Sequence, residues 1–387
     1  MNNGNVAWLE KNGTIQIKEF PVPEAKDDGI LIEIGLAGIC GTDVHIKQNY
    51  RNFAAGLPMV LGHEISGRIV QMGKNANELM YCDDDLEIGD KIVLYDFLPC
   101  GNCFMDRKYG IDYTVLCETP LPGYCEHADK WPYFIGGYGD YFYIQPGTWI
   151  WKVSEAMNFE RAVLTEPFSM GIRAVEKALS LPSWRNMQTL SFGGTAVILG
   201  AGAIGILTAI SAKIAGAGKV ILSGGPEKNL KLAKSINAAD EVIDIFNTTK
   251  EQRLDIVRSM TPGGRGADAV FEAAGVSSAF KEGLEMTRKL GVFVEMGCLI
   301  DDGKTIDINV ARDIVAKDIT IYGVVSQPPQ TFTKSLSLLE RFSDVYDFSK
   351  IVTDKFDVAK ADDALALAMS EKEKGIKVAI KGIGYSK

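Results

Sequence analysis

The chain has 387 residues, of which 46% are hydrophobic and 24% charged, and its formal net charge is −9. This composition is typical of a folded globular protein that is too long for one hydrophobic core, so we expect two domains. The negative charge disfavours nucleic acid and anionic membranes as partners, and the lack of an apolar run of 18 residues predicts a cytosolic protein without a membrane span.

Short apolar segments separated by glycine and proline characterise the first part of the chain. Residues 6–18 alternate weakly, which predicts a hairpin that ends at Pro21-Val22-Pro23. Further strands are expected at residues 30–36, 65–70 and 87–94. Short strands divided by such turns favour a small β-rich barrel.

Two loops next to these strands carry residues that can bind a metal. The first offers Cys40, Thr42, Asp43 and His45, and the second offers His63 and Glu64. Sulfur, imidazole nitrogen and carboxylate oxygen are the donors that zinc prefers, and a catalytic zinc keeps one position open. Taken singly, a cysteine or histidine is more often a structural core residue. Two of the three histidines of the chain lie in these loops, so we favour a catalytic zinc over purely structural roles for these residues.

A second group of cysteines begins at Cys100-Gly101-Asn102-Cys103, with Cys117 and Cys125 downstream. Cys-x-x-Cys is a common first half of a structural zinc site, and in a reducing compartment clustered cysteines favour metal over disulfides. The alternative is a degenerate lobe without metal.

The clearest motif follows an apolar segment at residues 195–199, which we expect to be a buried parallel strand. Gly200, Gly202 and Gly205 then form a GxGxxG motif that precedes a helix expected from Ile206 to Ala215. A strand, this motif and a helix in that order are typical of dinucleotide binding, because the glycines permit the turn, the approach of pyrophosphate and close helix packing. Ala203 and Ile204 complete the predicted phosphate loop.

The end of the next strand, at residues 219–222, bears on the choice of nucleotide. NAD enzymes usually have an acidic residue there, whereas this chain has Ser223 followed by Gly224 and Gly225. The glycines are expected to leave room beside the serine. No arginine is present for a 2′-phosphate, and Lys228 is the nearest cation. We therefore expect weak discrimination between NAD and NADP.

Strands and helices continue to alternate up to residue 323, which predicts a doubly wound parallel sheet and an α/β fold class. The motifs also occur in a familiar order. Gly62-His63-Glu64 with Gly67 and Gly73, the pair Glu166-Pro167, and the GxGxxG motif together resemble the zinc-dependent medium-chain alcohol and polyol dehydrogenases, in particular the sorbitol and threonine dehydrogenase branch.

This resemblance implies a GroES-like catalytic domain at residues 1–168, a Rossmann domain at 169–325 and a return to the catalytic domain at 326–387. It also implies roles for the motif residues. Zinc would be held by Cys40, His63 and a carboxylate, either Glu64 or Glu166. Thr42 would take the proton of the alcohol and His45 would pass it to solvent, while Asp43 would orient a zinc ligand.

For the cysteine lobe, the resemblance places Asp106 at the third ligand position and makes Cys117 the best fourth ligand after Cys100 and Cys103. Cys125 or His127 could replace it. The implied activity is hydride transfer between a secondary alcohol or ketone and NAD or NADP, with a polyol or sugar-type alcohol favoured and a threonine-like or simple alcohol as the alternative. A homo-oligomer, dimer or tetramer, is expected. The rivals are a zinc- or nucleotide-binding protein without catalysis and a zinc-free quinone reductase.

Overall fold

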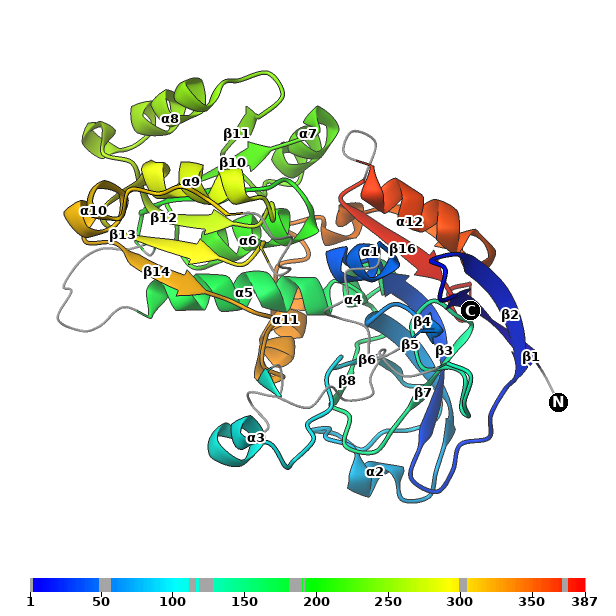
Figure 1. Ribbon diagram of the computed structural model, residues 1–387. Coiled ribbons are helices and arrows are strands. Elements are labelled where there is room, and N and C mark those ends of the chain that lie inside the picture. Colours follow the sequence, from blue (N-terminus) through cyan, green and yellow to red (C-terminus); the bar gives the residue numbers. More distant parts are fainter. Residues whose placement is uncertain are drawn as a thin grey trace. The chain divides into compact units, whose positions relative to one another are not determined.

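The computed structural model describes residues 3–48, 57–110, 116–117, 128–180, 190, 192–298, 305–370 and 375–386 (Figure 1). The chain folds into two compact units. Unit 1 consists of Met1–Glu166, Pro328–Ser343 and Ile351–Lys387, and unit 2 consists of Pro167–Gln327 and Asp344–Lys350. Each unit is described by itself.

Unit 1 is built around β-sheets. Its larger sheet has the strand order β15-β16-β3-β5-β6-β8, with β7 paired to β3. Its strands are β3 (Ile30–Gly38), β5 (Glu64–Met72), β6 (Lys91–Leu94), β7 (Tyr141–Ile144), β8 (Ile150–Lys152), β15 (Val352–Asp357) and β16 (Lys377–Lys381). A three-stranded sheet has the order β2-β1-β4 and consists of β1 (Asn3–Leu9), β2 (Ile15–Pro21) and β4 (Met59–Val60).

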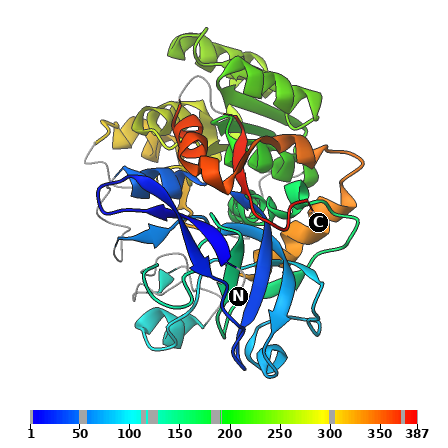
Figure 2. The same ribbon diagram turned by 90° about the vertical axis from the view of Figure 1, so that its right-hand side faces the viewer.

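Strand β3 lies at the centre of unit 1. It pairs antiparallel with β5, β7 and β16, so a strand from near the carboxyl end lies next to one from near the amino end (Figures 1 and 2). Its residues Ile30, Leu31 and Ile32 are fully buried. The apolar segment predicted a strand here, and its burial places the loop that follows it, which carries Cys40, on the sheet of unit 1.

Short helices surround these sheets. They are α1 (Gly41–Lys47), α2 (Ala76–Leu79), α3 (Phe104–Tyr109), α4 (Phe159–Ala162), α11 (Gln330–Arg341) and α12 (Ala361–Met369), with a 3-10 turn at Val358–Lys360. Helix α5 (Thr165–Leu179) begins in unit 1 and continues in unit 2, and a 3-10 turn at Phe348–Ile351 lies where the chain returns to unit 1.

Unit 2 contains a six-stranded sheet in which all neighbouring strands are parallel, in the order β11-β10-β9-β12-β13-β14. The strands are β9 (Thr195–Leu199), β10 (Lys219–Gly224), β11 (Glu241–Asp244), β12 (Ala267–Glu272), β13 (Thr287–Glu295) and β14 (Thr320–Gly323). Counted along the unit, this is the order 3-2-1-4-5-6 of a Rossmann sheet. The predicted α/β fold class with a Rossmann sheet and a second, β-rich domain is confirmed.

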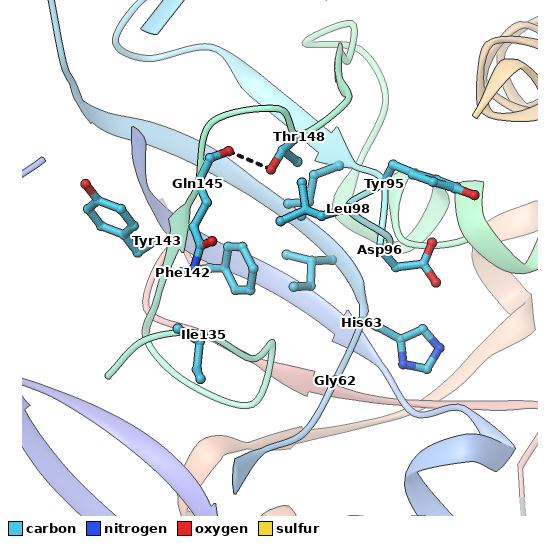
Figure 3. A pocket seen from close by; sticks show the side chains of 12 residues that line it. Gly62, His63, Tyr95, Asp96, Leu98, Ile135, Phe142, Tyr143, Gln145 and Thr148 are labelled. Carbon is cyan, nitrogen blue, oxygen red and sulfur yellow. Dashed lines mark hydrogen bonds between the residues drawn. The ribbon is translucent and has the colours of Figure 1, made fainter. Parts of the chain in front are cut away.

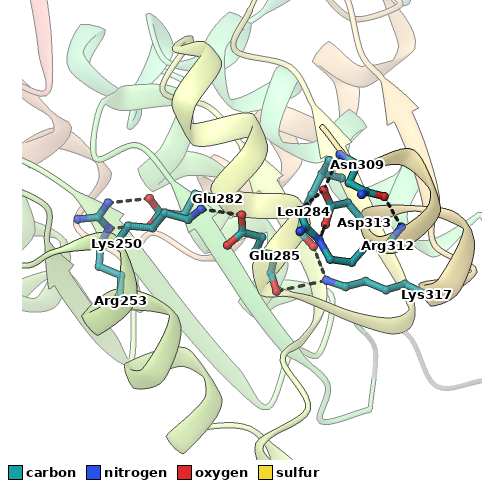
Figure 4. A network of polar contacts seen from close by, with 9 residues as sticks. All are labelled: Lys250, Arg253, Glu282, Leu284, Glu285, Asn309, Arg312, Asp313 and Lys317. Carbon is teal, nitrogen blue, oxygen red and sulfur yellow. Dashed lines mark hydrogen bonds and ion pairs between the residues drawn. The ribbon is translucent and has the colours of Figure 1, made fainter. Parts of the chain in front are cut away.

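The helices of unit 2 connect these strands. They are α6 (Ala203–Ile214), α7 (Glu227–Ser235), α8 (Lys250–Ser259), α9 (Ser277–Met286) and α10 (Val310–Asp313), with 3-10 turns at Pro262–Gly264 and Val315–Lys317. Helix α6 begins three residues earlier than predicted, because Gly202 already forms its amino-terminal cap. Ion pairs join helices α8 and α9 through Arg253 and Glu282 at 2.6 Å, and Lys317 Nζ donates to the Leu284 carbonyl at 2.7 Å (Figure 4).

Candidate active site

The Cys40 loop forms the transition from strand β3 to helix α1. Cys40 caps this helix, and its backbone N–H donates to Asp43 Oδ2 at 2.9 Å. Its sulfur lies 3.7 Å from Thr42 Oγ1. Thr42 and Asp43 are both buried, at 7% and 0% exposure. The loop therefore brings a thiol and a hydroxyl together and fixes the backbone of the cysteine through a carboxylate.

The His63 loop is tied to the same carboxylate. The backbone N–H of Gly62 donates to Asp43 Oδ1 at 3.1 Å, and that oxygen lies 3.8 Å from His63 Nδ1. Gly62 has φ +94°, and a Cβ there would lie 2.6 Å from the Tyr138 ring. The Tyr138 hydroxyl donates to Asp43 Oδ2 at 2.8 Å. Asp43 thus joins both loops and a buried tyrosine.

Five side chains with metal-binding atoms gather around His63. Donor atoms of Cys40, His63 and Glu64 lie within 4.8 Å of one another, and so do those of His63, Asp96 and Glu166. Figure 3 shows the Asp96 carboxyl group on the same side of a pocket as the His63 ring. We call these five residues the inner cluster. The four sequence-predicted candidates for the catalytic zinc therefore lie in two triads that share His63, and Asp96 joins the triad of Glu166.

Glu64 has a buried cationic partner. Lys377 Nζ lies 2.6 Å from Glu64 Oε1 and also donates to the Ile39 carbonyl at 3.1 Å. The side chains of Glu64 and Lys377 are almost completely buried. Burial alone would lower the pKa of Lys377, but Glu64 and Cys40 raise it overall, so the lysine is an ammonium ion. The charge of Glu64 is therefore compensated inside the protein.

Glu166 and Asp96 are in a different electrostatic position. Burial, with Asp96 and Glu64 nearby, raises the pKa of Glu166 to about 8. Burial also raises the pKa of Asp96 to about 6, although His63 opposes this shift. If both carboxyl groups ionise, two negative charges lie close together where water solvates them poorly. A divalent cation bound there would compensate this charge. The sulfur, nitrogen and carboxylate donors suit zinc. The inner cluster therefore fits the predicted metal.

Thr42 and His45 both lie on helix α1, three residues apart, so their side chains are on one face of the helix. Thr42 is buried next to the Cys40 sulfur, whereas His45 is half-buried, and burial lowers its pKa. A neutral imidazole near solvent can accept a proton. Their predicted relay stays a prediction.

The cysteine lobe, Cys100, Cys103, Asp106 and Cys117, is a second group whose donor atoms all lie within 4.8 Å of one another. The Cys100 thiol is 3.1 Å from Asp106 Oδ2, and the sulfurs of Cys103 and Cys117 are 3.9 Å apart. Three sulfurs and one carboxylate oxygen make a four-ligand set that fits a closed structural zinc site. The alternative ligands Cys125 and His127 lie outside the described residues.

The GxGxxG motif has the geometry of a phosphate loop. Gly200 has φ +115°, and a Cβ there would lie 2.8 Å from the Ala273 backbone. A Cβ at Gly205 would lie 1.9 Å from the Gly200 carbonyl oxygen, so helix and strand approach too closely for any side chain. A Cβ at Gly202 would meet no described atom within 4 Å. The open backbone at this cap, followed by Ala203 and Ile204 in the first turn of α6, fits the approach of a pyrophosphate.

The end of β10 differs in part from expectation. A Cβ at Gly224 would lie 2.6 Å from the Ala201 backbone nitrogen, and one at Gly225 would lie 2.5 Å from the Phe246 ring. The expectation that these glycines leave room beside Ser223 was wrong, because they are places of close packing.

Ser223 and Lys228, both predicted to contact the nucleotide, differ in exposure. Ser223 is 2% exposed, and its hydroxyl has no hydrogen-bond partner among the described residues. Lys228 is exposed on helix α7. A hydroxyl at the carboxyl end of a parallel strand can bond a ribose but cannot repel a phosphate.

A pair of acids was missed by the sequence analysis. Glu272 and Glu295 end the neighbouring strands β12 and β13 in register. Glu272 accepts hydrogen bonds from the backbone N–H groups of Ala274 and Gly275, and Glu295 accepts from those of Gly297 and Cys298. Burial, with Glu295 next to it, raises the pKa of Glu272 to about 8. Burial therefore favours the protonated form of Glu272 near neutral pH.

Three residues of the inner region were also missed. Lys377 interrupts the apolar segment 376–380, and Asp96 interrupts the segment 95–98. A charged residue inside an apolar strand signals a buried partner or a site, so both could have been found. Tyr138 carries no such signal, because a tyrosine in a glycine-rich segment is more often a core residue than part of a site.

Comparisons with known proteins follow the same division of the chain. The family model for the alcohol dehydrogenase GroES-like domain matches residues 26–155, and that for zinc-binding dehydrogenase matches residues 203–341. Sorbitol dehydrogenase of Bacillus subtilis is 27% identical over 384 residues, covering 98% of this chain and 97% of the relative. L-threonine 3-dehydrogenase of Bacillus velezensis is 29% identical over 342 residues, covering 87% of each.

Among solved structures, an alcohol dehydrogenase from Thermotoga maritima has a TM-score of 0.86 and 28% identity, covering 99% of this chain and 100% of the other. Within the described part of the chain, none of the helices is both long and apolar enough to span a membrane.

Proposed function

Because the chain belongs to the zinc-dependent medium-chain alcohol and polyol dehydrogenases, we propose that it oxidises a secondary alcohol, a polyol or sugar-type alcohol, with NAD or NADP as hydride acceptor. One observation carries this proposal: the donor atoms of the inner cluster converge in unit 1, while unit 2 presents the open glycine loop that suits a dinucleotide. A protein that had lost its catalysis would have no need to keep both.

Cys40, His63 and Glu166 are the proposed zinc ligands. Glu64 was the other candidate carboxylate, but Lys377 already neutralises it. Glu166 is the carboxylate whose ionisation a cation would favour, since burial and its acidic neighbours raise its pKa. When bound, zinc supplies a Lewis acid that lowers the pKa of an alcohol oxygen.

The remaining residues position groups and move a proton. Asp43 holds the backbone of both ligand loops, and its carboxylate, 3.8 Å from His63 Nδ1, would help to orient that ring. Thr42 Oγ1 accepts the alcohol proton and gives up its own hydroxyl proton toward His45, which releases a proton to solvent. The bound nicotinamide nucleotide supplies the hydride acceptor. Gly200, Gly202, Ala203, Ile204 and Gly205 would bind its pyrophosphate.

The decisive experiment is a panel of secondary alcohols with NAD and with NADP, followed by the absorbance of the reduced nucleotide. Activity should disappear with a strong chelator and return with zinc. Turnover that a chelator leaves unchanged, with no zinc in the purified protein, would favour the zinc-free reductase. Zinc and nucleotide binding without turnover on any alcohol would favour a non-catalytic protein. Threonine as the best substrate would select the threonine-like alternative.

The choice of nucleotide is tested by Ser223→Asp. A carboxylate at the end of β10 bonds ribose hydroxyls and repels a 2′-phosphate, so the variant should shift kcat/KM toward NAD by roughly tenfold or more. Wild type should use both nucleotides with similar kcat/KM. A wild type that is already strongly NAD-selective, and unchanged by the substitution, would show that Ser223 does not face the ribose. A homo-oligomeric state and a cytosolic location stay predictions, for sedimentation and fractionation to test.

A further inference from the structure

Asp96 has no role in the proposed chemistry. It follows strand β6 and is 9% exposed. Its Oδ1 atom is buried and has no hydrogen-bond partner in the described part of the chain. One of its oxygens lies within 4.8 Å of donor atoms of both His63 and Glu166. A buried acceptor without a hydrogen-bond donor destabilises the protein. We therefore expect a ligand to provide the donor for this oxygen.

The pocket next to Asp96 is mainly apolar. Its wall includes Ile65, Leu94, Leu98, Ile135 and Phe142. In Figure 3 Asp96 and His63 lie on one side of the pocket, apart from Gln145 and Thr148. Thr148 already donates to the Gln145 carbonyl at 2.7 Å. Of these groups, Asp96 is the anionic acceptor at the end where the reaction is proposed.

Direct coordination of the metal does not account for Asp96, although its charge lies close to the proposed ligands. Cys40, His63 and Glu166 already provide three protein ligands, and a catalytic zinc needs its fourth position for the substrate. Proton transfer does not account for it either, since Thr42 lies next to the Cys40 sulfur and serves that step in the proposed function. What remains is recognition of a part of the substrate close to the reacting carbon.

We propose that Asp96 is a specificity-determining residue that accepts a hydrogen bond from a hydroxyl group on the carbon next to the one oxidised, so that the enzyme selects vicinal diols over simple alcohols. This inference rests on the proposed function, because it assigns the substrate of the same site. A bound simple alcohol would exclude water from the carboxylate and offer it no hydrogen-bond donor. Leaving a buried acceptor unpaired in this way weakens binding strongly.

A hydroxyl fits better than an ammonium group. The donor would lie within a few ångströms of His63 and Glu166, where a divalent cation is proposed, and a second cation there would be repelled. Lys377 already adds one buried positive charge through its pair with Glu64. A neutral hydroxyl gains the hydrogen bond without this repulsion.

The test compares 2-butanol, 2,3-butanediol and 3-amino-2-butanol on the zinc-loaded full chain. Wild type should prefer the diol over 2-butanol in kcat/KM by roughly 10- to 100-fold, the range expected for a hydrogen bond to a charged acceptor. Asp96→Leu, which keeps the branched shape but removes the acceptor, should lower kcat/KM for the diol to the level of 2-butanol. Asp96→Asn keeps an acceptor oxygen and should retain part of it. Asp84→Asn, on an exposed loop, is the matched control and should behave as wild type.

Calorimetric binding of the same alcohols and zinc content by mass spectrometry separate this inference from the proposed function. If nothing is oxidised but the diol still binds more tightly than 2-butanol, and only when Asp96 is present, the proposed function fails while recognition of the diol by Asp96 stands. Loss of zinc in both Asp96 variants would overturn the inference, since Asp96 would then be a ligand. An unchanged diol preference in Asp96→Leu, or a wild-type preference for the amino alcohol, would also overturn it.

Discussion

The two groups of metal-binding residues in unit 1 are built in opposite ways. The cysteine lobe takes all its donors from residues 100–117, and its three cysteines are half-exposed around the short helix α3. The inner cluster takes its donors from positions as distant as Cys40 and Glu166, and its ion pair reaches across 313 positions to Lys377. A local group can form without the rest of the fold, whereas the inner cluster exists only once unit 1 is complete.

The two groups also differ in how their carboxyl groups ionise. In the lobe, burial opposes ionisation of Asp106, but hydrogen bonds from Cys100 and from the Gly101 N–H lower its pKa. In the inner cluster, burial and like charges raise the pKa of Glu166 to about 8. The lobe therefore stabilises an anion by itself, while the inner cluster depends on an added cation to hold Glu166 ionised.

The strongest test of the comparison removes a donor from the inner cluster. We expect Cys40→Ser and His63→Ala each to reduce kcat by roughly 10³-fold or more, because the Lewis acid is lost. Nucleotide affinity should stay near wild type, since the glycine loop lies in unit 2. Zinc content, kcat and nucleotide titration are the measurements, with Cys82→Ser as control. Near-normal turnover by a zinc-depleted variant would contradict the metal mechanism.

The next effect is on stability. Lys377→Met leaves Glu64 buried without its cation, and breaking a buried pair in this way destabilises a protein by about 3–5 kcal/mol. Denaturant unfolding measures this change. The double variant with Glu64→Gln should recover most of it, because no uncompensated charge remains. Lys108→Met on the exposed face of α3 is the control from the lobe. Equal losses from both lysine substitutions would remove the distinction between the two groups.

A smaller effect is expected in the way the stability of the metal-free protein depends on pH. A carboxyl group whose pKa is raised from 4.5 to about 8 contributes stability below pH 4.5, and this is lost as the pH rises toward 8. Glu166→Gln cannot ionise, so at pH 7 without metal it should be more stable than wild type by about 2 kcal/mol, allowing for partial solvation. With zinc the order should reverse. Urea unfolding at pH 5 and at pH 8 measures the change in the free energy of unfolding. If the metal-free wild type became more stable from pH 5 to pH 8, the expected direction would be wrong.

The sequence predicted those parts of both groups that depend on local spacing. Cys100 and Cys103 lie on one turn, and Gly200 to Gly205 follow a strand, so their neighbours are fixed by short-range geometry. Strands such as β3, β5 and β9 could be predicted because their apolar segments, bounded by glycine or polar residues, indicate burial. The start of α6 was placed too late, because its cap residue, Gly202, lacks the polar side chain that usually marks the start of a helix.

What could not be predicted depends on tertiary packing. The pairing of Lys377 with Glu64 follows from β16 lying next to β3, and the sequence does not state which strands become neighbours. The contact of Tyr138 with Asp43 has the same origin. The glycines at the end of β10 were misread as open space, because a glycine that avoids a clash and one that leaves a gap look alike in a sequence.

The smallest expected effect on chemistry comes from the lobe. Cys103→Ser removes a thiol that lies 3.9 Å from Cys117 and caps helix α3. We expect it to lower the melting temperature by about 5 °C and to leave kcat/KM within roughly twofold of wild type, because the damage stays local and far in sequence from Cys40. Thermal melting and zinc per chain are the measurements, with Asn102→Ser as the neighbouring control. One zinc per chain in the wild type, together with unchanged melting of the variant, would show that the lobe binds no metal. A large loss of turnover with normal melting would show instead that the lobe contributes to the reaction, and the division between the two groups would fail.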